Sequence, residues 1–452
     1  MAEPNDGTAL TGLTRDIADR LADFALRTAS GDGPDRPHLH HDRLGLANGH
    51  PGMALALLCA GRALDDSGLL DGARAVLRSA AAGTAQRPYS GPGLYTGTAG
   101  FASVLLAFAE HDERYLPSLR RVADSFGEQV AATRRPAPGT GLPFTAYDVV
   151  EGASGQLAAA VRLATVVGAP EGSPLRTAID ELVDYLDAVT AADGQQRFGW
   201  LMTPAHYPPA FPWYAERAPH GMYNLGFAHG LPGILGAFTA AAAAGYGGSR
   251  VTGKVADLAE WLVLHRTADP DPRAGWAVCL QAEEHTLRPV HDPAEEPSRA
   301  AWCYGAPGIG TGLLAAAAVL DDADLRETAI GALRRVLDTD PAYRHVFAPT
   351  LCHGHAGMAA VYRRAHAETG VEEFRDMADR SLAAVVGLAD PDRPFLVADE
   401  PEAGQRVDDP GFLTGAAGTL LALSAAVRPE VADWDELLFL TPARSGERTA
   451  AR

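Results

Sequence analysis

Residues 305–320 read Gly-Ala-Pro-Gly-Ile-Gly-Thr-Gly-Leu-Leu-Ala-Ala-Ala-Ala-Val-Leu. The stretch begins with two glycines that are separated by two residues. As a helix, the run that follows would be apolar on nearly every side. Proline just inside a helix start is preset for the first turn. Glycine lets neighbouring backbone approach closely and can adopt a positive φ. Because a helix that is apolar all round is buried all round, the stretch predicts a buried helix entered through a crowded turn.

The same arrangement occurs seven times in the 452 residues, each time followed by an Ala/Leu-rich run. The first glycines of the pairs are Gly49, Gly97, Gly152, Gly230, Gly305, Gly354 and Gly415. Between successive pairs there is room for a second, amphipathic helix, and residues 116–130, 174–189 and 325–337 carry charge on one face. Such self-similarity indicates a repeat protein built from helical hairpins.

Seven helical hairpins can stack as an open solenoid or close into a ring. An open solenoid would expose one side of each inner helix, and these helices offer no polar stripe. We therefore predict an all-α fold, an α/α toroid (double α-barrel) of about seven inner and seven outer helices, formed by residues 1–440 as one domain. Roughly the first ten residues and the tail 441–452 are expected to be disordered. Residues 190–228 and 264–302 are expected to form ordered loops or short hairpins at one mouth of the barrel.

The composition is acidic, because Asp and Glu outnumber Lys and Arg by 57 to 38 and give a formal charge of −19. Such a surface repels phosphate backbones, so nucleic acid is excluded as a partner. The N-terminal residues lack the basic and apolar regions of a secretory signal. The apolar runs are too short to span a bilayer. We expect a soluble, cytoplasmic protein.

If the repeats are equivalent, residues at equal offsets from the first glycine occupy equal heights in the barrel. The residue immediately before that glycine can form hydrogen bonds in every repeat. The seven residues are Asn48, Thr96, Glu151, His229, Tyr304, His353 and Thr414. They predict a polar ring at one end of an apolar barrel, where a binding site is expected.

Cysteines stand two residues before the first glycine in the adjacent fifth and sixth repeats, at Cys303 and Cys352. Neighbouring helices lie about 8–10 Å apart, so two inward-facing thiols could share one ion, and His353 could add a nitrogen. Two thiolates and an imidazole form a zinc ligand set with a vacant fourth position, as in catalytic sites. The alternative is that two cysteines so far apart in sequence share no ion. Cys59 and Cys279 fit buried small hydrophobic residues.

Four segments resemble the signatures of the lanthionine synthetase C-like family, the class I lantibiotic (lanthipeptide) cyclases. They are Trp302-Cys303-Tyr304-Gly305, Leu351-Cys352-His353-Gly354, Asn-Leu-Gly-Phe-Ala-His-Gly at 224–230 and Tyr-Asp-Val-Val-Glu-Gly at 147–152. The likeness covers about residues 44–427, in the family's order. It implies an α/α toroid and one Zn²⁺ held by the residues matching Cys303, Cys352 and His353. It also implies an enzyme that adds peptide cysteine thiols to dehydroalanine or dehydrobutyrine, which gives lanthionine or methyllanthionine rings.

The same resemblance implies four catalytic residues. His229 matches the family's proposed acid, and Arg299 resembles an active-site arginine that would serve the enolate or act as a supporting charge. Asp148 and Tyr304 match other active-site positions and would orient the histidine and assist proton transfer. Considered without the resemblance, each has a structural alternative: a helix cap for His229, a surface ion pair for Arg299, an exposed loop carboxylate for Asp148 and a core position for Tyr304.

The implied substrate is a dehydrated lanthipeptide precursor with a leader and a core. The resemblance further implies a separate dehydratase and assembly with an exporter, peripheral to the membrane. Two alternative functions remain. One is a noncatalytic peptide-binding scaffold that keeps the barrel and the metal. The other is a zinc hydrolase on a similar barrel, which is disfavoured because no suitable H-x-E or H-E-x-x-H element is present.

Overall fold

The computed structural model describes residues 7–30, 44–139, 141–209, 212–267, 275–291 and 298–440. These residues divide into two compact units, and each unit is described by itself. The first unit contains residues up to 90, 95–119 and 345–438, and the second contains 91–94, 120–344 and the residues from 439. The single domain over 1–440 stays a prediction, and the tail 441–452 lies outside the described residues.

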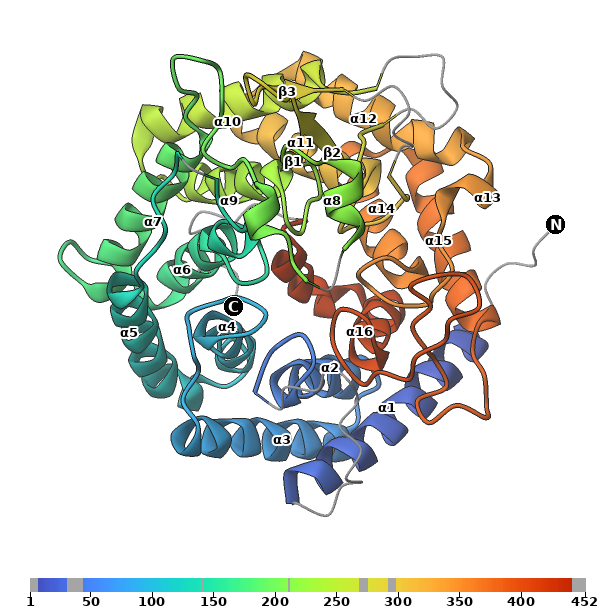
Figure 1. The fold of residues 1–452 in the computed structure, drawn as a ribbon. Helices are drawn as coiled ribbons and strands as arrows, with labels where there is room; N and C mark the ends of the chain where they lie inside the picture. The colour runs from blue at the N-terminus through green and yellow to red at the C-terminus, as the bar shows by residue number, and fades with distance from the viewer. Residues whose placement is uncertain are drawn as a thin grey trace. The chain divides into compact units, whose positions relative to one another are not determined.

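The first unit consists of paired helices (Figure 1). Its elements are α1 (Gly7–Ser30), α2 (His50–Ala63), α3 (Ser67–Gln86), α4 (Thr98–Ala109), η1 (Glu113–Tyr115), α14 (His355–Thr369), α15 (Glu372–Gly387), α16 (Ala416–Val427) and η4 (Pro429–Leu438). Helices α2, α4, α14 and α16 each begin directly after the first glycine of a pair, contain the second, and are buried along most of their length. The amphipathic helices α3 and α15 pack on α2 and α14.

The last repeat takes its second helix from the opposite end of the chain, because α1 packs on α16. Leu10 and Ile17 of α1 are buried, and the Thr14 hydroxyl donates to the Leu10 carbonyl oxygen. The expectation of disorder over about the first ten residues is therefore wrong from Gly7 onward. It failed because the apolar positions of this helix find their partner in a distant part of the sequence.

The second unit repeats the same pairing (Figure 1). Its elements are most of α5 (Leu116–Ala132), η2 (Phe144–Ala146), α6 (Ala153–Val167), α7 (Pro174–Thr190), η3 (Pro204–His206), α8 (Trp213–Arg217), β1 (Met222–Asn224), α9 (Leu231–Ala243), α10 (Gly248–Leu264), β2 (Cys279–Ala282), β3 (Pro289–Val290), α11 (Ala306–Leu320), α12 (Ala323–Asp338) and α13 (Pro341–Arg344). The buried helices α6, α9 and α11 pack side by side, with α7, α10 and α12 against them. The helices predicted at 116–130, 174–189 and 325–337 are confirmed as α5, α7 and α12.

Close approach of the backbone explains why glycine occupies the second position of each pair. A Cβ atom on Gly357 would lie 1.9 Å from the carbonyl oxygen of Leu351, six residues earlier, and one on Gly418 would lie 1.9 Å from that of Phe412. Positive φ matters less than the sequence suggested. Among the first glycines of the seven pairs only Gly305 adopts it, at +99°.

Backbone hydrogen bonds join equivalent positions of neighbouring repeats, two residues before the first glycine. In the first unit the Ala47 amide donates to the Tyr95 oxygen at 3.0 Å, and the Cys352 amide donates to the Leu413 oxygen at 2.8 Å. In the second unit the Ala228 amide donates to the Cys303 oxygen at 3.1 Å. The predicted equivalence of equal offsets is therefore confirmed for these neighbouring repeats within each unit.

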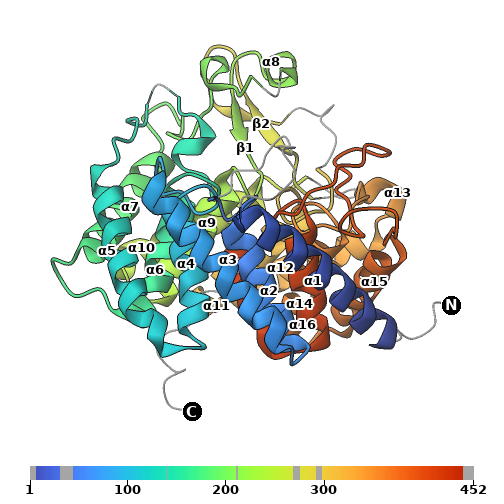
Figure 2. The same cartoon turned by 90° about the horizontal axis from the view of Figure 1, so that it is seen from below.

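The two long intervals of the second unit supply a small antiparallel sheet of order β1-β2-β3. This sheet and α8 project beyond the ends of the unit's helices (Figure 2). The expectation of ordered loops or short hairpins is confirmed for their described residues; 210–211, 268–274 and 292–297 are outside the description. Within the described chain, no helix is long and apolar enough to cross a membrane.

Candidate metal centre and acid–base pair

The turn before α14 carries two of the predicted ligands, Cys352 and His353. Leu351, the residue before them, is completely buried and anchors the turn in the core. The Cys352 amide is fixed by its hydrogen bond to the Leu413 oxygen. The side chains of Cys352 and His353 remain partly exposed, because they stand on the two residues just before the glycine that starts the helix. The core thus positions the turn, and neither of the two polar side chains is fully buried.

A carboxylate lies against the His353 ring. Nε2 of His353 is 3.1 Å from Oδ1 of Asp399, and both side chains are largely buried, with 12% and 8% exposure. The same Oδ1 accepts a hydrogen bond from the Thr350 hydroxyl at 2.9 Å. Sequence reasoning missed Asp399 and Thr350, because neither belongs to the repeated positions that were compared.

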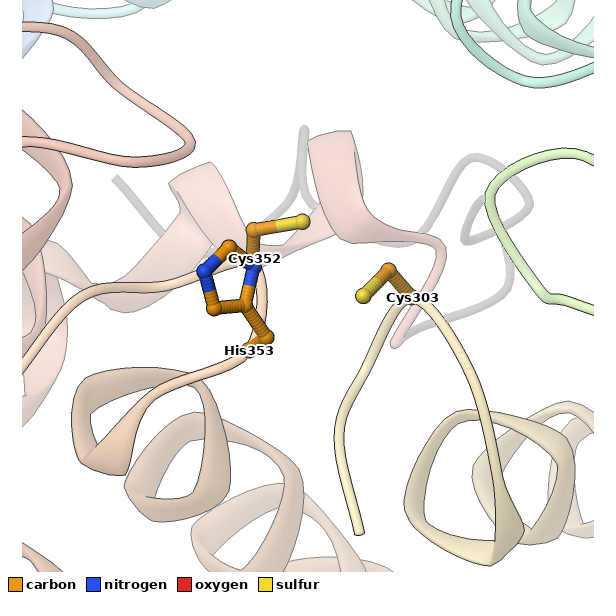
Figure 3. A group of neighbouring side chains, drawn as sticks. All are labelled: Cys303, Cys352 and His353. Atoms are coloured by element: carbon orange, nitrogen blue, oxygen red, sulfur yellow. The ribbon is translucent and has the colours of Figure 1, made fainter. Parts of the chain in front are cut away.

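The turn before α11 presents the third predicted ligand, Cys303. Trp302 precedes it and is 1% exposed, while Cys303 itself is 7% exposed. Figure 3 draws Cys303 with Cys352 and His353 as one group of neighbouring side chains. Each offers one potential ligand atom, and these atoms lie within 4.8 Å of one another.

This set of donors fits zinc. Two thiol sulfurs and one imidazole nitrogen are ligand types that zinc takes in proteins, and three protein ligands leave a position for substrate, as in catalytic sites. Figure 3 shows that Nδ1 of His353 lies on the side of the two sulfur atoms. Its other nitrogen, Nε2, is the one beside Asp399. The ring can therefore bind a metal through Nδ1 while Nε2 keeps a carboxylate neighbour.

A second constellation, in the second unit, joins His229 to Asp148. Nδ1 of His229 lies 2.8 Å from Oδ2 of Asp148. The other carboxylate oxygen of Asp148 accepts the amides of Glu151 and Gly152, both at 2.8 Å. Asp148 is completely buried, so the alternative of an exposed loop carboxylate is wrong. The ring of His229 is 28% exposed, and Phe144 packs against it with 4.6 Å between ring centroids.

Tyr304 lies next to this pair, with its ring centroid 6.4 Å from that of His229. Its hydroxyl accepts a hydrogen bond from the Asn224 amide at 2.9 Å and is also hydrogen-bonded to the Tyr214 hydroxyl. Burial raises the pKa of Tyr304 well above its ordinary value, and the Tyr214 hydroxyl adds to the rise. Tyr304 is therefore a neutral phenol at physiological pH. The sequence did not single out Tyr214 or Asn224 as its partners.

Arg299 has a different environment. It lines a small cavity with Trp276, Tyr343 and Arg344, and neither His229 nor Asp148 is among the residues that line this cavity. The carbonyl oxygen of Arg299 would lie 2.1 Å from a Cβ atom on Gly305, so its backbone belongs to the turn before α11. The structure thus places His229, Asp148 and Tyr304 close together. Arg299 lines the small cavity, and its backbone belongs to the turn before α11.

The paired helices define an all-α repeat fold that carries these two constellations, and comparisons with known proteins identify the family. The family model for lanthionine synthetase C-like proteins matches residues 40–439. The chain therefore belongs to the lanthionine synthetase C-like family.

The comparisons also find individual proteins that this chain resembles. The nisin biosynthesis protein NisC of Lactococcus lactis subsp. lactis is 25% identical over 345 residues, which are 73% of this chain and 73% of that protein. The solved structure of nisin cyclase superimposes with a TM-score of 0.74 at 20% identity, over 95% of this chain and 98% of that one. This similarity confirms the predicted α/α toroid. A cellobiose 2-epimerase structure from Bacillus thermoamylovorans B4167 has a TM-score of 0.47 at 10% identity, over 92% of this chain and 99% of that one.

Proposed function

We propose that this member of the lanthionine synthetase C-like family is a zinc-dependent lanthipeptide cyclase. It adds cysteine thiols of a dehydrated precursor peptide to dehydroalanine or dehydrobutyrine residues and so closes lanthionine and methyllanthionine rings. The observation that carries the proposal is the grouping of Cys303, Cys352 and His353, which supplies a three-donor set for one Zn²⁺ per chain. Family membership supports the reaction class.

The first chemical requirement is a nucleophilic sulfur. A free cysteine thiol with a pKa near 8.5 is only about 3% thiolate at pH 7. A zinc ion in this site would hold the peptide's cysteine as a thiolate, because coordination deprotonates a thiol. Cys303 and Cys352 would together balance the charge of the ion, which keeps a third bound sulfur electron-rich.

The second requirement is a proton for the carbon next to the new bond. When the sulfur bonds to the β-carbon, the electrons of the C=C bond move toward the carbonyl oxygen, and the α-carbon then takes a proton. We assign this proton to His229. Asp148 accepts the Nδ1–H of His229, so Nε2 is the nitrogen that would take up the proton released by the substrate thiol on binding zinc and then deliver it to the α-carbon. The two amide bonds to Asp148 fix the carboxylate and therefore the ring.

Tyr304 and Arg299 complete the proposal. Tyr304 stays protonated because its pKa is raised, so it can donate a hydrogen bond to the enolate oxygen or assist proton transfer. Arg299 would act as a supporting positive charge from the turn that carries Cys303. Its place beside Trp276 favours a supporting role over direct contact with the enolate.

The proposed partners follow from the reaction. Ring closure needs a residue that has already lost water, so a separate dehydratase supplies the substrate, a precursor with a leader and a core. We further propose a cytoplasmic enzyme that assembles with an exporter, peripheral to the membrane. The net charge of −19 supports the expectation that nucleic acid is no partner.

A reconstituted reaction tests the proposal. Purified protein is mixed with a dehydrated precursor peptide, and free cysteines are counted by alkylation and mass spectrometry. We expect the wild type to consume thiols and His229→Ala to be slower by about 10²–10⁴-fold with its zinc retained. Equal rates for the His229→Ala variant and the wild type would overturn the assignment of the proton donor. A wild type that binds the peptide and zinc but closes no rings would favour the noncatalytic scaffold.

A further inference from the structure

Asp399 lies in the segment between α15 and α16, where the sequence contains no recognised motif. Taken over the whole residue, its exposed fraction is only 6%. Its backbone is fixed by a two-way pairing with Val407, in which the Asp399 amide donates at 2.8 Å and its oxygen accepts at 2.9 Å. This buried carboxylate is therefore held at a defined place, and its side chain needs polar neighbours to offset the cost of burial.

The neighbours of the carboxylate belong to the turn that carries the metal ligands. Oδ1 of Asp399 accepts the hydroxyl of Thr350, which is completely buried and stands two residues before Cys352. The same Oδ1 lies 3.1 Å from Nε2 of His353. That contact is one of distance and charge rather than a fully aligned hydrogen bond. One carboxylate oxygen thus connects Thr350 and His353 across the ligand turn.

The contact with Asp399 favours one of the two tautomers of the His353 ring. A neutral imidazole has one N–H and one nitrogen with a free lone pair, and only the second can bind a metal. A carboxylate next to Nε2 favours the proton on Nε2 and leaves the lone pair on Nδ1. Figure 3 shows Nδ1 on the side of the sulfurs of Cys303 and Cys352. The contact therefore selects the tautomer that the proposed metal site needs.

We propose that Asp399 is a positioning residue for the metal site. Supported by Thr350, it holds the protonated Nε2 of His353 so that Nδ1 faces the ion and is a stronger donor. The inference rests on the proposed zinc site. Carboxylate partners of ligating histidines orient the ring and raise its basicity, and their loss typically lowers metal affinity by about 10–100-fold.

Three variants and a matched control test the proposal in the full-length protein. Asp399→Ala removes the carboxylate, Asp399→Asn keeps an acceptor oxygen without the charge, and Thr350→Val removes the supporting hydroxyl at similar volume. The control is Asp409→Asn in the last repeat. Asp409 accepts the Gly411 amide and the Thr414 hydroxyl in its own turn.

Zinc affinity is measured by competition with a chromophoric chelator, and the visible spectrum of the cobalt-substituted protein reports the ligand field. We expect Asp399→Ala to bind zinc about 10–100-fold more weakly, with Asp399→Asn and then Thr350→Val less affected. The cobalt spectrum should shift in the Asp399 variants. Asp409→Asn should match the wild type in both measurements. Unchanged zinc affinity and an unchanged spectrum in both Asp399 variants would overturn the proposal.

Two further comparisons keep the outcome interpretable. If the wild type itself binds no zinc, the proposed zinc site fails, and Asp399 is left with a structural contact only. If the wild type binds zinc and Cys303→Ala does not, the site stands, and the Asp399 variants decide the inference alone. Circular dichroism and thermal unfolding check each fold. Should Asp399→Ala not fold, Asp399→Asn carries the test, and an affinity and spectrum equal to those of Asp409→Asn would refute the proposal.

Discussion

The turns of the sixth and seventh repeats, neighbours in the first unit, share one backbone design and differ in chemistry. Each has a completely buried residue three positions before its first glycine, Leu351 in one and Phe412 in the other. The Cys352 amide donates to the Leu413 oxygen, which joins the two turns. At the next two positions, however, Cys352 and His353 stand in the sixth repeat, where Leu413 and Thr414 stand in the seventh.

The carboxylates that serve the two turns differ in the same way. Asp409 belongs to the turn of the seventh repeat and accepts hydrogen bonds within that turn, from the Gly411 amide and the Thr414 hydroxyl. Asp399 comes from outside the turn of the sixth repeat and reaches His353 as well as Thr350. The comparison indicates that the glycines and the buried residue specify the turn, whereas the two residues before the first glycine carry the chemistry proposed for it.

The largest effect is expected from substituting the residue two positions before the first glycine of the sixth repeat. Cys352→Ala should lose zinc and lower the cyclisation rate by more than about 10³-fold, since the nucleophile is no longer activated. Leu413→Ala at the equivalent position should keep zinc and cost about 1 kcal/mol of stability. Metal analysis and the alkylation assay check both. Full zinc content in Cys352→Ala would show that this position is not a ligand.

Asp148→Asn should have the next largest effect. It removes the charge beside Nδ1 of His229 but keeps the shape of the side chain, so we expect a rate about 10–10²-fold lower with normal zinc content. Peptide turnover under saturating substrate measures it. The control is Asp409→Asn, which changes a carboxylate that also bonds its own turn. A rate equal to that of the control would mean that Asp148 only stabilises its turn.

Substitution of the second glycine of each pair tests the backbone construction that the two turns share. Gly357→Ala and Gly418→Ala each place a methyl group 1.9 Å from a backbone oxygen. The backbone must shift, so we expect each variant to lose about 3 kcal/mol of unfolding free energy, and by similar amounts. Denaturant unfolding measures this. A large loss at Gly357 with none at Gly418 would contradict the idea that both turns use the same construction.

How much of the fold and of the candidate site could be predicted from the sequence depends on whether the interactions are local or join distant segments of the chain. The seven glycine pairs predicted the turns and buried helices, because close packing and helix entry are local demands that recur at each repeat. The ligand positions of Cys303, Cys352 and His353 were predicted from register and family resemblance. Asp399 and Tyr214 were not, because each comes from a segment outside the repeat pattern and reaches its partner only through the fold. The pairing of α1 with α16 was not predicted either, because it joins opposite ends of the chain.

The smallest expected effect concerns Cys59, a cysteine outside the proposed site. Burial raises its pKa to about 12, so at pH 8 only roughly one molecule in ten thousand carries the thiolate. The native, metal-free protein should therefore give the same number of reactive thiols as its Cys59→Ala variant, and differ by one only after denaturation. A native difference of one thiol would place Cys59 among the reactive cysteines.

The most direct test of the account is the zinc content of the purified wild type beside that of Cys303→Ala, both folded by circular dichroism. The account predicts about one zinc per chain in the wild type and none in the variant. A folded wild type that stays empty after zinc is offered, or a variant that keeps its full zinc content, would contradict the assignment of Cys303, Cys352 and His353 as the metal centre.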